Sequence, residues 1–133
     1  MIRFANPPEL PAPAAPYSHQ AEVGGDVRWL VLSGQLGQAA DGTLPSDVAG
    51  QLELALANVS LNLAAAGMGV EDVVQLRTYV VGPSDPVQRG AVFRAWLGDH
   101  RPCMTLVQVA GLAAPQFLVE VEALACRDGE SAG

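Results

Sequence analysis

Two glutamates lie in an otherwise apolar segment near the C-terminus, residues 117–126. The segment favours a strand, and successive side chains of a strand point to opposite faces, so Glu120 and Glu122 lie on the same face. Carboxylates are rarely buried without a partner, yet both ends of this face are apolar. Two interpretations stay open: the face meets water, or it lines a site where a carboxylate acts as acid or base.

Other candidate residues are weaker when taken alone. Ser33 and Gly34 end an apolar strand, where they form either a plain turn or a set of backbone and hydroxyl groups at a site. Tyr17 and His19 follow a proline-rich segment. His19 and His100 are the only histidines, and no spacing matches a metal motif, so we expect no metal ion.

The bulk composition excludes several classes of partner. The chain of 133 residues carries a net charge of −7, and all seven of its basic residues are arginines. We expect no nucleic-acid binding, because proteins that bind nucleic acids normally carry a basic patch. No run reaches the roughly 18 apolar residues that span a bilayer, and no secretion signal is recognised. We therefore expect a cytoplasmic protein with no membrane partner, in which Cys103 and Cys126 are free thiols.

The length fits a single domain over residues 1–133. Residues 1–16 form a proline-rich lead-in, because proline cannot donate to a sheet. Residues 128–133 are expected to be a flexible tail. Half of the residues are hydrophobic, which is enough for a packed core without disulfides.

Apolar spacing and capping residues predict two helices and several strands. The predicted helices run from Ser46 or Asp47 to Gly67 and from Ser84–Pro86 to about Leu97, and the predicted strands are 27–32, 73–81, 105–110 and 117–126, with short strands around Phe4 and 21–23. Right-handed crossovers would place both helices on one face of a mixed sheet. The strands carry apolar residues on both faces, and no element is left to cover the second face. We therefore expect another subunit to cover it.

An ordered set of short motifs resembles the RidA/YjgF family, which is also labelled endoribonuclease L-PSP-like. The motifs are Pro16-Tyr17-Ser18, Leu32-Ser33-Gly34-Gln35, Asp41-Gly42, Gln51, Leu56-Ala57-Asn58-Val59, Ala64-Ala65-Ala66-Gly67, Asp72-Val73-Val74, Thr78-Tyr79-Val80, Arg101-Pro102 and Val119-Glu120-Val121-Glu122-Ala123. They span about residues 15–127, which is nearly the whole chain, and the ordered set is more specific than any one motif.

The resemblance implies an α+β fold, a chorismate-mutase-like mixed β-sheet with two helices packed on one face, and assembly into a homotrimer. It also implies three clefts between subunits that bind small carboxylate-bearing molecules. In the deaminating branch, these clefts hydrolyse enamines and imines to 2-oxo acids and ammonia without any cofactor. Glu120 matches the glutamate that positions or activates water. Tyr17, Ser33 and Gly34 match residues of the cleft wall.

The chain departs from the deaminating branch at three positions. The arginine that clamps the substrate carboxylate falls at Met104, the following cysteine at Leu106, and a helix asparagine at Gly90. Methionine has no hydrogen-bond donor for a carboxylate. Losing an arginine that binds a carboxylate through two hydrogen bonds lowers kcat/KM by roughly two decades. We therefore expect Met104 and Leu106 to line a more apolar substrate site beside Glu120. Activity on 2-aminoacrylate is expected to be weak or absent.

The expected function is thus the binding of a small metabolite in clefts between subunits, with or without its hydrolysis. One alternative keeps imine deamination, with Arg101 or another cation replacing the missing arginine. A second alternative is a ligand-sensing module without turnover. The ribonuclease label of the family is disfavoured by the acidic charge and by the missing histidine pair.

Overall fold

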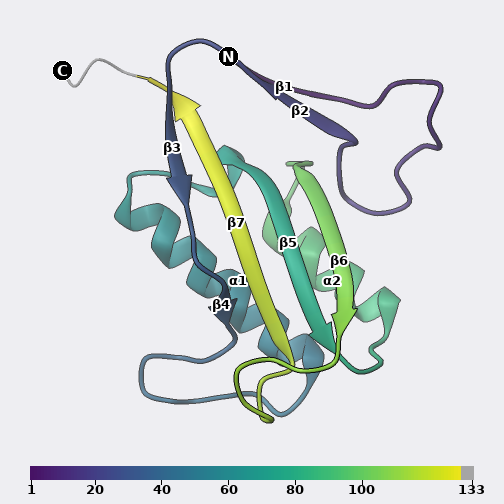
Figure 1. Cartoon of the computed structure of the whole chain (residues 1–133), viewed down its shortest axis with the longest axis vertical. Coiled ribbons are helices and arrows are strands. Elements are labelled where there is room, and N and C mark those ends of the chain that lie inside the picture. Colours follow the sequence, from purple (N-terminus) through teal and green to yellow (C-terminus); the bar gives the residue numbers. More distant parts are fainter. Residues whose placement is uncertain (130–133) are drawn as a thin grey trace.

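The structure, a computed structural model, describes residues 1–129 and consists of a mixed β-sheet with two helices on one face (Figure 1). The strands are β1 (Ile2–Ala5), β2 (Gln20–Val23), β3 (Val27–Val31), β4 (Gln35–Leu36), β5 (Val73–Val81), β6 (Cys103–Val109) and β7 (Val119–Asp128), and the helices are α1 (Val48–Ala65), α2 (Pro86–Leu97) and the short 3₁₀ helix η1 (Val70–Asp72). Within residues 1–129, no helix is long and apolar enough to cross a membrane. The α+β prediction is confirmed.

Local signals fix the ends of both long helices. The Asp47 side chain accepts a hydrogen bond from the backbone of Gly50 and caps α1, and Gly67 follows the helix with a φ of 70°. A positive φ strains residues with a Cβ, so a glycine there ends the helix at little cost. Asp85 caps α2, and Pro86 occupies its first position. Both helix boundaries agree with the sequence prediction.

The main sheet has the strand order β3-β7-β5-β6, with β4 also paired to β7. Among the strand pairs that the structure describes, only β5 and β6 are parallel, and α2 links them across one face of the sheet. The short strands expected near the N-terminus do form, but β1 and β2 pair with each other and not with the main sheet. Because β5 lies between β6 and β7, the two last strands of the chain are not neighbours.

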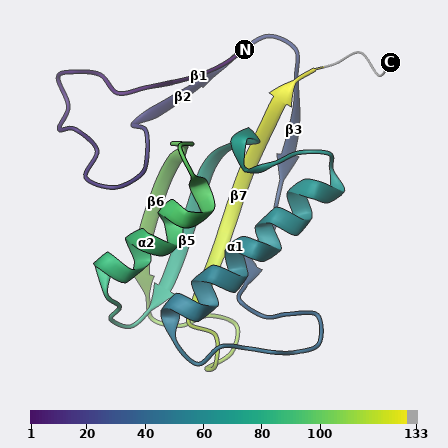
Figure 2. The same ribbon diagram turned by 180° about the vertical axis from the view of Figure 1, so that it is seen from behind.

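The core lies between the helices and one face of the sheet (Figure 2). Residues of α1 at helical spacing are fully buried, among them Leu52, Leu56 and Val59. On β7, alternate residues from Val119 to Ala125 face the same core, so β7 turns its even-numbered residues to the other face. That alternation decides where the two glutamates point.

Within residues 1–129, no helix lies over the second face of the sheet (Figure 1). Trp29 is 48% exposed, Val31 75% and Val107 42%. The sequence prediction of an uncovered, partly apolar face is therefore confirmed. Asp128 ends β7, so the predicted tail does not begin there, and residues 130–133 of that tail lie outside the described residues.

Candidate functional site

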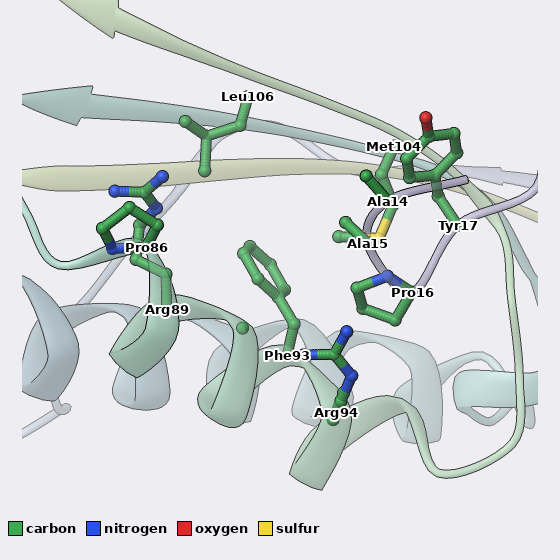
Figure 3. A pocket seen from close by; sticks show the side chains of 11 residues that line it. Ala14, Ala15, Pro16, Tyr17, Pro86, Arg89, Phe93, Arg94, Met104 and Leu106 are labelled. Atoms are coloured by element: carbon green, nitrogen blue, oxygen red, sulfur yellow. The ribbon is translucent and has the colours of Figure 1, made fainter. Parts of the chain in front are cut away.

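Tyr17, Met104 and Leu106 line one cavity of about 310 Å³ (Figure 3). The cavity lies between β6, α2 and the segment 14–17 that precedes β2. Much of its wall is apolar, and Phe93 of α2 projects into it from the helix side. This volume suits a small metabolite. The cavity thus brings together three of the six residues that the sequence analysis selected.

The segment that carries Tyr17 is fastened to the start of β6. Ser18 donates from its backbone to the Pro102 carbonyl, 2.9 Å away, and from its hydroxyl to the Arg101 carbonyl at 2.5 Å. A ring nitrogen of His19 lies 2.7 Å from the Pro11 carbonyl, and the His19 ring packs edge-on against Tyr17. His19 therefore holds the loop that places the tyrosine.

Helix α2 adds two arginines to the cavity wall that the sequence analysis did not select. Arg89 and Arg94 lie on either side of Phe93 (Figure 3). Gly90 also lines the cavity, one turn before Arg94. A glycine inside a helix lowers stability by about 1 kcal/mol relative to alanine. The unfavourable Gly90 was therefore the signal in the sequence that another group occupies the space beside this position.

Arg101, the cation named beforehand as a substitute for the missing arginine, is engaged elsewhere. Its Nη1 donates to the carbonyls of Gly98 and His100, at 2.7 and 2.9 Å. These bonds tie it to the turn after α2, and Arg101 does not line the cavity.

Glu120 lies on the other face of the sheet. It stands on β7 opposite Leu36 on one side and Tyr79 on the other. Its carboxylate lies against Gly34, so closely that a Cβ on residue 34 would overlap it. Ser33 is exposed in the break between β3 and β4. Glu120, Ser33 and Gly34 therefore form a second group, apart from the cavity of Tyr17, and the prediction that one cleft holds all four stays a prediction.

Glu122 is engaged differently from Glu120. The Tyr79 hydroxyl donates a hydrogen bond to the Glu122 carboxylate, and Arg77 stands opposite Glu122 on β5. The hydrogen bond raises the pKa of Tyr79 above its ordinary value, because it stabilises the protonated phenol beside an anion. Glu122 thus has a structural partner within the chain.

The selected residues therefore fall into two groups on opposite faces of one chain. The expectation that Met104 and Leu106 lie beside Glu120 is wrong within a single chain, because β5 separates β6 from β7. Within residues 1–129, no group of three or more His, Cys, Asp or Glu side chains could hold a metal ion. The sequence expectation of no metal stays a prediction.

The family model for endoribonuclease L-PSP matches residues 8–127. The chain belongs to this family, the RidA/YjgF family. Among its relatives, the 2-iminobutanoate/2-iminopropanoate deaminase of Escherichia coli is 31% identical over 121 residues, which cover 88% of this chain and 91% of that protein. The E. coli protein TdcF, named a putative reactive intermediate deaminase, is 31% identical over 131 residues, which cover 96% of this chain and 98% of TdcF.

Solved structures of the RidA/YjgF family share the fold. The Rid protein YyfB of Yersinia pestis superposes with a TM-score of 0.81 at 33% identity, covering 95% of this chain and 98% of that one. TdcF of E. coli with bound serine superposes with a TM-score of 0.68 at 27% identity, covering 95% and 99%. The family thus includes proteins named as deaminases of small imino acids and a structure with a bound amino acid.

Proposed function

We propose that this chain hydrolyses small imines in clefts between the subunits of a homotrimer, without a cofactor. The observation that carries the proposal is the division of the site into two incomplete groups. The cavity with Tyr17 and Met104 lies on the helix side of β6, and Glu120 with Ser33 and Gly34 lies on the open face. A second copy of the chain could supply the missing group to each cavity.

The uncovered face supports this assembly. An exposed apolar surface that includes Trp29, Val31 and Val107 is typical of a subunit interface. In a closed symmetric trimer, the same contact recurs between each pair of neighbouring subunits. Each of the three cavities would therefore lie next to the Glu120 group of one neighbouring subunit. We expect light scattering to give three times the chain mass of 13.8 kDa. A monomer in solution would contradict the proposal.

Glu120 has the role of the base. A water oxygen bonds to the imine carbon as Glu120 takes a water proton and passes it to the nitrogen. The carbon–nitrogen bond then breaks as a second proton moves from the new hydroxyl to nitrogen, which gives ammonia and a 2-oxo acid. The proposed roles of Tyr17 and of the Ser33–Gly34 backbone are to shape the cleft around the substrate.

Activity on 2-aminoacrylate is proposed to be weak, because Met104 and Leu106 give the cavity an apolar wall with no donor on β6. Substrates with a longer aliphatic chain would bury that chain against these residues and react faster. The small-molecule ligand is therefore an aliphatic 2-imino acid. We keep the prediction of a cytoplasmic protein that binds no nucleic acid.

The test follows release of 2-oxo acids from imines formed in situ, with 2-aminoacrylate and a longer aliphatic 2-imino acid compared side by side. The wild-type protein should accelerate the longer substrate more, and Glu120→Gln should abolish both rates. Glu53→Gln, an exposed change on α1, is the matched control and should leave them unchanged. Equal or greater activity on 2-aminoacrylate would refute the apolar preference. Binding of 2-oxo acids without any hydrolysis would identify a ligand-sensing protein instead.

A further inference from the structure

Arg94 folds back along α2 into space that Gly90 leaves open. An ideal Cβ on residue 90 would lie 2.9 Å from Arg94 Nη1, closer than such atoms normally approach. Any side chain at position 90 would therefore displace the guanidinium. Gly90 is in the interior of α2, where glycine costs about 1 kcal/mol. The space that Arg94 occupies explains why this destabilising glycine is present in α2.

The other arginines near the cavity are bonded to the protein itself. Arg89 Nη1 donates to the Ser84 carbonyl at 3.0 Å and to the Ser84 hydroxyl at 2.5 Å. Arg101 donates to two carbonyls in the turn after α2. The Arg94 guanidinium has no hydrogen-bond or ion-pair partner among residues 1–129, and the side chain is exposed. Of the two arginines that line the cavity, Arg94 is thus the one with no donor engaged by the protein, whereas Nη1 of Arg89 is held by Ser84.

The surroundings of Arg94 suit a carboxylate that carries an apolar chain. Its guanidinium points toward the Ala15–Pro16 side of the cavity, and Phe93 and Met104 form apolar wall between the helix and β6 (Figure 3). A planar guanidinium matches a carboxylate with two parallel hydrogen bonds. A monocarboxylate with an aliphatic chain would place its charge at α2 and its chain against β6.

We propose that Arg94, given room by Gly90, anchors the carboxylate of the ligand in this cavity. The inference rests on the proposed function for its choice of ligand, and it assigns the binding residue that β6 lacks at Met104. The anchor comes from the helix and not from the strand. A ligand would therefore sit with its carboxylate displaced toward α2, which leaves the space along Met104 and Leu106 for its apolar part.

The test measures binding of 2-oxobutanoate and of its neutral amide, 2-oxobutanamide, to the full-length protein by calorimetry. The wild-type protein should prefer the acid. Arg94→Gln should weaken binding of the acid by about 10- to 100-fold, with little change for the amide, because a charge-assisted pair is lost. Gly90→Ala should weaken binding of the acid by a smaller factor, because the new Cβ displaces only the flexible end of the Arg94 side chain. Arg3→Gln removes the same charge from an exposed position on β1 and is the matched control.

A rescue experiment separates binding from structure. Met104→Arg in the Arg94→Gln background should restore the preference for the acid, which a merely structural role of Arg94 would not allow. Acid binding that stays within twofold of wild type in Arg94→Gln, or no acid preference in the wild-type protein, would overturn the inference. If Arg94→Gln loses acid binding but the wild-type protein hydrolyses no imine, the inference stands and the proposed hydrolysis fails. If hydrolysis depends on Glu120 but not on Arg94, the proposed hydrolysis stands and the inference about Arg94 fails.

Discussion

Gln51 offers a test of how the chain holds the segment that leads to Glu120. Its side chain is fully buried in the first turn of α1 and bonds three backbone groups outside the helix. Nε2 donates to the carbonyls of Pro45 and Gln116 at 2.9 and 3.0 Å, and Oε1 accepts from the Leu118 amide at 2.8 Å. One amide group therefore joins the segment that precedes α1 to the segment that precedes β7. We expect Gln51→Leu to destabilise the protein strongly.

The magnitude follows from what each backbone group can do after the substitution. A buried polar group left without a partner costs about 1–3 kcal/mol. Gln116 is exposed and its carbonyl can turn to water, whereas Pro45 and Leu118 are half-buried. Two orphaned groups, offset partly by the burial of an apolar side chain in place of an amide, give a loss of about 3 kcal/mol in the free energy of unfolding.

Urea unfolding followed by circular dichroism measures this loss, at one protein concentration because the proposed association of subunits would add to stability. Asn62→Leu is the control: Asn62 is exposed on the same helix and donates only to the Asn58 carbonyl one turn before it. That variant should change stability by less than about 0.5 kcal/mol. A loss below about 1 kcal/mol for Gln51→Leu would refute the reasoning, because it would mean that the three bonds are replaced without cost.

Three further predictions concern single groups. Gly34→Ala should slow imine hydrolysis by about 10- to 100-fold, because the new Cβ displaces the Glu120 carboxylate; an unchanged rate would exclude Glu120 as the base. Thr78→Val should raise the free energy of unfolding by about 1 kcal/mol in urea titrations, since Thr78 Oγ1 is buried without a partner among the described residues; destabilisation would show that the hydroxyl is satisfied. Burial raises the pKa of the half-buried Cys103, so in Cys126→Ala protein its alkylation should reach half its maximal rate at a higher pH than in urea, and a lower pH would contradict this.

Local signals were sufficient for the elements but not for their order. Asp47, Gly67 and Pro86 set the helix ends, because capping depends on residues close in sequence. Strand order depends on pairings between distant segments, and nothing in the apolar pattern indicated that β5 separates β6 from β7. That pairing is why Met104 does not lie beside Glu120 within one chain.

The site was predictable where a residue type has few uses and unpredictable where it has many. Glu120 stood out because a carboxylate on a partly apolar strand is unusual. Arg94 did not stand out, because a basic residue in the last turn of a helix is common and favourable there. Only its position over Gly90 at the cavity makes it a candidate for binding.

The placement of the two groups on opposite faces has a genetic consequence. If each cleft draws its cavity from one subunit and its glutamate from the next, a chain defective in one group can still serve a neighbour with the other. Two inactive variants, one at Glu120 and one at Arg94, would complement each other when expressed together. With random assembly of equal amounts, about one quarter of the clefts would combine two intact groups. A chain defective in one group would inactivate only one cleft of a mixed trimer, so the number of active clefts would equal the number of normal chains, without a dominant effect.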